Sequence, residues 1–190
     1  MQRIHKSLAV VTVMGCLSLA WPAGAQPSAS NDTAAVKQFE AAIARYMAMR
    51  QRLTTEVRGP VKNSSSTQLT NASDALAAAI ERARKGAQAG SIFNAPVKAM
   101  FKRRIAETIR RERLESALAD IDDDGTAGPA PKVHLRLPVT TQMATMPPAL
   151  LQALPQLPKE LEYRILGRYL VLRDVNASLI LDYIPAAVTR

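Results

Sequence analysis

The sequence is poor in the residues that most often carry chemistry at active sites. Among its 190 residues it has one cysteine, Cys16, and two histidines, His5 and His134. A zinc site needs three or four Cys, His or carboxylate ligands, and a catalytic triad needs a well-placed histidine. No glycine-rich phosphate loop and no G-x-S-x-G turn occurs in the chain. We therefore expect neither an enzyme nor a cofactor.

Aromatic residues are also scarce, at 4% of the chain, although the chain is basic. Its 25 Lys and Arg against 16 Asp and Glu give a formal net charge of +9. A basic protein is attracted to anionic surfaces. Proteins that bind single-stranded nucleic acid, however, rely on aromatic side chains on which bases stack. We therefore expect no nucleic acid partner and leave an unknown protein or an anionic partner open.

The first 25 residues have the three parts of a secretory signal peptide. Arg3 and Lys6 supply positive charge, and residues 8–20 form an apolar run that is too short to cross a bilayer. Residues 23–25 read AGA, which fits a cleavage site after Ala25. We expect a secreted or periplasmic protein with no transmembrane segment after cleavage, and no disulfide because no cysteine is left.

A lipoprotein is the alternative to a cleaved secretory signal. Residues 13–16 read VMGC and resemble a lipoprotein box, in which Cys16 would be acylated. The apolar run continues beyond Cys16 and a complete A-x-A site follows, so we favour cleavage after Ala25.

Three stretches carry apolar residues at the three- and four-residue steps of an amphipathic helix. The first runs from a cap at Asn31 or Asp32 to about Val57, and the second runs from about Gln68 to Gln88. The third runs from a cap at Asn94 to about Ala119, with Pro96 in the first turn, where a missing N–H is tolerated.

Arg50 stands at the one position of the first apolar stripe where an apolar residue is missing. Such an arginine is either a buried functional charge or a side chain whose stem lies on the apolar face while its head stays in water. We favour the solvated head. The other members of the stripe are Val36, Phe39, Ile43, Tyr46, Leu53 and Val57.

The third helix is strongly basic. It carries Lys98, Lys102, Arg103, Arg104, Arg110, Arg111 and Arg113 against Glu107, Glu112 and Glu115. We expect most of this face to be solvated, with ion pairs between residues four apart. Arg104 and Arg111 are seven residues apart and project close to the apolar side, which includes Phe101. These three residues are our candidates for binding an anionic or acidic partner.

Residues 120–125 read DIDDDG and fit the first half of an EF-hand calcium loop. The second half fails, because Pro131 occupies the twelfth position, where a glutamate belongs. We expect no metal site, and we keep Asp120, Asp122 and Asp124 as the metal candidates. The acidic run should help to end the preceding helix, because it opposes the helix dipole.

Residues Val133–Leu137 alternate and predict a short strand that could join a sheet further along the chain. If the leucines face inward, His134 and Arg136 point outward. His134 is the only histidine after the predicted cleavage site. A lone histidine is more often an exposed strand residue than a ligand or a base, and we interpret it so. Residues 148–154 predict one helical turn.

The clearest β pattern lies near the C-terminus. Leu161–Ile165, Tyr169–Arg173 and Leu179–Ile184 are short apolar or alternating runs. Gly167 suits a tight reversal after the first run, and residues 174–178 contain the turn-forming Asp, Asn and Ser. The pattern predicts a three-stranded antiparallel meander, which needs cover from the helices to be stable.

This region resembles the C-terminal β unit of RcnB-like periplasmic proteins, which are linked to nickel and cobalt homeostasis. It is also similar to uncharacterised secreted bacterial proteins with an LP-rich lead-in and a β-hairpin unit. The resemblance is carried by Leu157-Pro158, Tyr163, Arg164, Gly167, Leu170–Leu172, Asp174 and Leu179–Asp182. It implies a periplasmic setting with a structural or binding role, and it supplies no catalytic residue.

We therefore predict an α+β protein with three amphipathic helices followed by a small antiparallel β-meander of three or four strands. The predicted organisation is a signal peptide at 1–25, a helical region at 26–119, a connection at 120–160, the meander at 161–184 and a tail at 185–190. The leading function is a non-enzymatic secreted or periplasmic protein that acts by binding or as a structural component. The alternatives are a periplasmic metal-homeostasis protein, with ligands from the three aspartates and His134, and an enzyme with an unrecognised carboxylate site.

Overall fold

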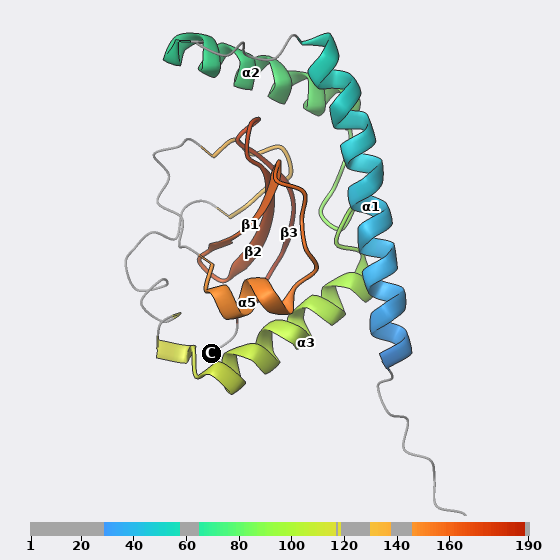
Figure 1. The fold of residues 1–190 in the computed structure, drawn as a ribbon, viewed down its shortest axis with the longest axis vertical. Coiled ribbons are helices and arrows are strands. Elements are labelled where there is room, and N and C mark those ends of the chain that lie inside the picture. The colour runs from blue at the N-terminus through green and yellow to red at the C-terminus, as the bar shows by residue number, and fades with distance from the viewer. Residues whose placement is uncertain (1–28, 58–64, 117, 119–129, 138–145, 189–190) are drawn as a thin grey trace, which may run out of the picture.

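The computed structural model describes residues 29–57, 65–116, 118, 130–137 and 146–188. Its elements are α1 (Ala29–Glu56), α2 (Ser66–Ala83), α3 (Ala95–Glu112), α5 (Pro148–Ala153), β1 (Leu161–Leu166), β2 (Tyr169–Asp174) and β3 (Leu179–Ile184). α1 runs along one side of the molecule, α2 and α3 cross its two ends, and the sheet lies between them (Figure 1). This arrangement confirms the α+β class and the order of three helices followed by a meander.

Several predictions concern residues outside the described ranges. The signal peptide, the lipoprotein box at Cys16 and the acidic residues Asp120, Asp122 and Asp124 all lie there. None of the helices in the described ranges is long and apolar enough to cross a membrane.

Side-chain caps begin two of the three long helices. Ser65 forms a capping box with Gln68, in which the Ser65 hydroxyl accepts from the Gln68 N–H and the Gln68 side chain accepts from the Ser65 N–H. Asn94 caps α3 by accepting from the Val97 N–H at 3.1 Å, as the sequence predicts. These caps satisfy backbone N–H groups that have no partner inside the helix.

α2 and α3 are shorter than the sequence predicts. α2 ends at Ala83 rather than near Gln88, and Gly86, with φ of 85°, lies in the turn beyond it. α3 ends at Glu112 because Arg113 adopts a left-handed conformation with φ of 53°. The Leu114 N–H then donates to the Ile109 carbonyl, which closes the helix as in a Schellman motif. Apolar periodicity continues past both ends, so it could not locate them.

The three strands form an antiparallel sheet in the order β1-β2-β3, within one residue of the predicted bounds. Tyr163 pairs with Leu172 between β1 and β2, and Leu170 pairs with Ile184 between β2 and β3. Gly167 turns the first hairpin with φ of 53°. A bulge between Leu172 and Arg173 shifts the β2–β3 register.

The predicted strand at Val133–Leu137 is only a partial addition to the sheet. His134 and Leu135 exchange backbone hydrogen bonds with Ile180 on the outer edge of β3, and Leu137 donates to the Ser178 carbonyl. Arg136 and Leu179 form an isolated antiparallel β-bridge. His134 has φ of 68°, which lies outside the β region, so a continuous fourth strand cannot form there.

The helix-facing side of the sheet carries the main core. Phe39 of α1, Phe93, Phe101 of α3 and Tyr163 of β1 form an aromatic cluster with ring centroids 5.1–6.4 Å apart. The opposite face carries a smaller cluster of Leu137, Leu166, Val171 and Ile180. The sheet is therefore buried on both faces, and the helices supply the cover that the meander needs.

Candidate functional site

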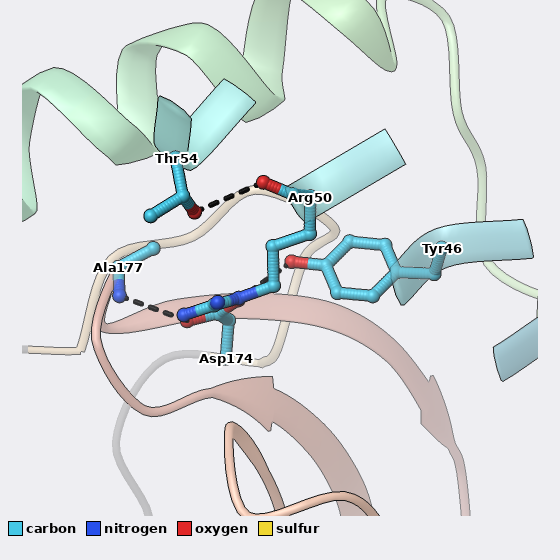
Figure 2. A network of polar contacts seen from close by, with 5 residues as sticks. All are labelled: Tyr46, Arg50, Thr54, Asp174 and Ala177. Atoms are coloured by element: carbon cyan, nitrogen blue, oxygen red, sulfur yellow. Dashed lines mark hydrogen bonds and ion pairs between the residues drawn. The ribbon is translucent and has the colours of Figure 1, made fainter. Parts of the chain in front are cut away.

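A buried polar network joins the middle of α1 to the end of β2 (Figure 2). The Tyr46 hydroxyl donates to Asp174 Oδ2 at 2.8 Å, and Arg50 Nε donates to the same oxygen at 2.5 Å. Arg50 is 7% exposed and Asp174 is 0% exposed. The interpretation of Arg50 as a solvated head was therefore wrong, because a buried carboxylate compensates the guanidinium charge.

Asp174 has no further capacity to accept hydrogen bonds with ideal geometry. Its Oδ2 accepts from Tyr46 and from Arg50 Nε, while its Oδ1 accepts from Arg50 Nη2 at 3.3 Å and from the Ala177 N–H at 3.0 Å. Four donors occupy the roughly four lone-pair sites of a carboxylate. The bond to Ala177 is the turn-forming role that the sequence predicts for Asp174.

The network changes the protonation chemistry of its members. Burial raises the pKa of Tyr46, and the charge and hydrogen bond of Asp174 raise it further, so the phenol stays protonated. Burial lowers the pKa of Arg50, but the hydrogen bond and charge of Asp174 outweigh this and raise the pKa above its ordinary value. The guanidinium is therefore a permanent buried cation.

A cavity of about 570 Å³ lies beside this network, between α1, α2 and the β2–β3 turn. Its apolar wall consists of Val57 at the end of α1, Leu69 and Ala72 on the first half of α2, and Leu76 further along the same helix. Leu69 is 50% exposed. The second half of α2 is different, since Ile80 is fully buried against the core. Leu69 and Ala72 on the first half of α2 therefore border a hollow, whereas Leu76 lines the hollow and also packs in the core.

The remaining walls of the cavity are polar. They include Arg50 from α1, Ser73 from α2, Lys159 and Glu160 from the segment before β1, and Asn176 from the β2–β3 turn. Arg50, Thr54 and Glu160 also border a second hollow of about 400 Å³. A cavity of this size, with one apolar and one polar side, is typical of small-molecule sites.

The three candidates for partner binding are not brought together as an exposed surface. Phe101 is fully buried in the aromatic cluster. Arg104 pairs with Asp32 of α1 at 3.8 Å and donates to the Ala153 carbonyl of α5. Arg111 is well exposed and pairs with its neighbour Glu112. Of these three residues Arg111 is the most exposed, with 66% of its side-chain surface accessible against 30% for Arg104.

The candidate metal ligands lie apart or outside the described residues. His134 is half-buried, and its Nε2 atom is enclosed without a hydrogen-bond partner among the described residues, so the prediction of an outward-facing strand residue is wrong. Arg136, the other residue predicted to point outward, is exposed and forms an ion pair with Asp74 of α2. Within the described ranges, no three His, Cys, Asp or Glu side chains converge in a way that could hold a metal ion.

Sequence reasoning missed the cavity and the pairing of Arg50 with Asp174. The missing apolar position at Arg50 was a usable signal, because a charge in a buried stripe requires a compensating partner. The partner stands 124 positions along the chain, and nothing in the pattern around Asp174 distinguishes it from a turn residue. Comparison with models of protein families, curated proteins and solved structures found no match for this chain.

Proposed function

We propose that this chain is a non-enzymatic binding protein, secreted or periplasmic by virtue of its predicted leader, which takes a small amphipathic molecule into the cavity beneath α2. One observation carries the proposal. Leu69, Ala72 and Leu76 of α2 line a hollow of about 570 Å³, and Leu69 is 50% exposed rather than packed in the core. The free energy falls when a ligand fills such a space, because the ligand removes the surrounding apolar side chains from water.

The polar side of the cavity supports an amphipathic ligand rather than a purely apolar one. Ser73, Lys159 and Asn176 offer hydrogen bonds on the wall opposite the leucines, together with the buried Arg50. Ligand pockets commonly combine an apolar lining with a few placed polar groups that orient the molecule. Neither metal homeostasis nor carboxylate catalysis is favoured by a specific observation in the described residues.

The test is binding of Nile red, a neutral fluorescent dye with an apolar body, to the purified protein. We expect saturable binding with a fluorescence increase at micromolar dye. Ala72→Phe places a ring in the cavity and should reduce the affinity at least about tenfold, because a benzyl group removes much of the space and its apolar contacts.

Ala75→Phe is the matched control, since Ala75 is an exposed residue on the same helix and does not line the cavity. It should bind the dye as the wild type does. Equal loss in both variants, or no saturable binding by the wild type, would show that the cavity is not a ligand site.

A further inference from the structure

The hydrogen-bonding groups around the cavity are unevenly divided between donors and acceptors. Among the described residues, the ionisable side chains on its walls are two cations, Arg50 and Lys159, and one anion, Glu160. The carboxylate of Asp174 is fully used inside the network and does not line the cavity. A ligand therefore meets more donors than acceptors.

Arg50 keeps one donor group available. Its Nε and Nη2 atoms are committed to Asp174, whereas Nη1 makes no hydrogen bond to any side chain or carbonyl of the described residues. The residue is 7% exposed and lines both the cavity and the second hollow of about 400 Å³. A guanidinium held rigidly by a carboxylate on one edge is preorganised to bind a second acceptor on the other.

Lys159 reinforces this preference on the neighbouring wall. It is exposed, and its ammonium group carries three donors on a flexible stem that can follow a bound head group. Glu160 acts in the opposite sense, because its negative charge repels an anionic head group, and repels one with two charges about twice as strongly as one with a single charge. A single negative charge on two oxygens fits this set of neighbours best.

We infer that the ligand of this cavity is an amphiphile with a carboxylate head, which accepts from Arg50 Nη1 and pairs with Lys159 while its apolar body lies against Leu69 and Leu76. The inference rests on the proposed function and adds the chemical class of the ligand. Arg50 then has two roles, since one edge of its guanidinium holds the fold through Asp174 and the other edge selects the ligand.

Three ligands with the same apolar body separate the head-group preference from apolar binding. Decanoate, 1-decanol and decyltrimethylammonium are each titrated calorimetrically, below their aggregation limits, into the purified protein. We expect decanoate to bind at least about fivefold more tightly than 1-decanol, because a charge-assisted hydrogen bond is stronger than a neutral one. Decyltrimethylammonium should bind most weakly.

Two variants test the residues. Arg50→Lys keeps a charge for Asp174 but removes the planar fork, and Lys159→Met removes an exposed charge that has no part in the network. Each should lower the affinity for decanoate by a larger factor than the affinity for 1-decanol, because only the carboxylate carries a charge. Arg52→Met is the matched control, because Arg52 is an exposed arginine on α1 that does not line the cavity.

The outcomes separate this inference from the proposal on which it rests. Equal affinity for decanoate and 1-decanol, or a decanoate preference that survives in Lys159→Met and in a folded Arg50→Lys, would overturn the carboxylate assignment and leave a cavity for apolar molecules. Binding of none of the three ligands would overturn both statements. Circular dichroism establishes the folding of each variant, and Lys159→Met tests the inference even if Arg50→Lys unfolds.

Discussion

Arg50 and Asp174 occupy one buried site although they are far apart in the chain. Each would be costly alone, because an isolated charge in a protein interior loses its hydration without compensation. Together they satisfy one another, and Tyr46 and Ala177 use the remaining lone pairs of the carboxylate. At the scale of single residues, the pair specifies how the end of β2 docks against α1.

Removing one charge of this pair should destabilise the protein strongly. Asp174→Asn leaves the Arg50 guanidinium buried without a counter-charge, which we expect to lower the free energy of unfolding by roughly 3–5 kcal/mol. Urea denaturation followed by circular dichroism measures the loss. Adding Arg50→Met to Asp174→Asn removes the orphaned charge and should recover at least half of that loss.

The control for this cycle is Arg52→Met, an exposed change on the same helix that should alter stability by less than about 0.5 kcal/mol. If the double variant proved no more stable than Asp174→Asn, charge compensation would not be the reason for the pair.

His134 should make stability depend on pH in the mildly acidic range. Burial lowers its pKa from the ordinary 6.5, and the nearby Arg84 lowers it further, although Glu81 partly opposes this. The unfolded chain therefore binds a proton at a higher pH than the folded protein does. The His134 contribution is complete above pH 6.5 and is lost as the pH falls through the lower folded-state pKa.

The measurement is the free energy of unfolding at pH 7.5 and pH 5.0 for the wild type and for His134→Asn. Asparagine tolerates the positive φ of this position and does not titrate. The wild type should lose more stability than the variant on acidification. Identical losses would mean that another group controls acid sensitivity.

At the scale of elements, a second buried aspartate holds the connection between α2 and α3. Asp182 of β3 is fully buried and accepts from the backbone N–H groups of Gly90, Ile92 and Phe93 at 2.7–2.8 Å. Arg84, just after α2, donates to the Leu181 carbonyl at 3.2 Å. Both contacts attach the inter-helix loop to β3, so the C-terminal end of α2 is anchored to the sheet.

Asp182→Ala should release that loop. The three backbone N–H groups would lose a charged acceptor in a buried place, at a cost of roughly 2–5 kcal/mol in unfolding free energy. Hydrogen exchange of the amides at residues 90–93 should accelerate more than exchange in β1. Unchanged protection of these amides would contradict the anchoring role. Asp74→Ala, which removes an exposed acid on α2, is the matched control.

At the scale of the whole molecule, α1, α2 and α3 enclose the sheet from one side and two ends (Figure 1). The aromatic cluster around Phe101 fills the space between α1, α3 and β1, whereas Leu69 and Ala72 of α2 line the cavity. Densely packed aromatic rings therefore stabilise the end of the molecule at α3. The cavity beside Arg50 occupies the end at α2. The aromatic cluster contributes stability only, whereas Arg50 beside the cavity contributes both to stability and to the site that we propose binds a ligand.

Phe101→Ala tests this division. The ring is fully buried and contacts Phe39, Phe93 and Tyr163, so its loss should cost about 3–5 kcal/mol in unfolding free energy. Arg111→Ala, an exposed change on the same helix, should cost less than about 0.5 kcal/mol. Guanidinium denaturation compares the two, and a mild effect of Phe101→Ala would show that the cluster is not the stabilising centre.

The sequence by itself determined the local structure of this protein. Alternation and turn residues located the three strands to within one residue, and the Asn94 cap located the start of α3. These signals act between neighbours in the chain, because caps, turns and alternation depend on backbone geometry over a few residues. The ends of α2 and α3 escaped prediction because left-handed residues and loop anchors close them.

Only the tertiary structure decided what the charged residues do. Asp174 and Asp182 look like turn and strand residues in the sequence, yet each is fully buried with donors from distant helices or loops. The sequence predicts Phe101 on a binding surface, whereas the structure buries it in the core. The sequence predicts a solvated head for Arg50, whereas the structure makes it a buried cation beside the cavity. The physical reason is that burial and charge compensation depend on which segments of the chain meet in space. Apolar periodicity shows that one face of a helix is buried, but it does not show which segment buries it.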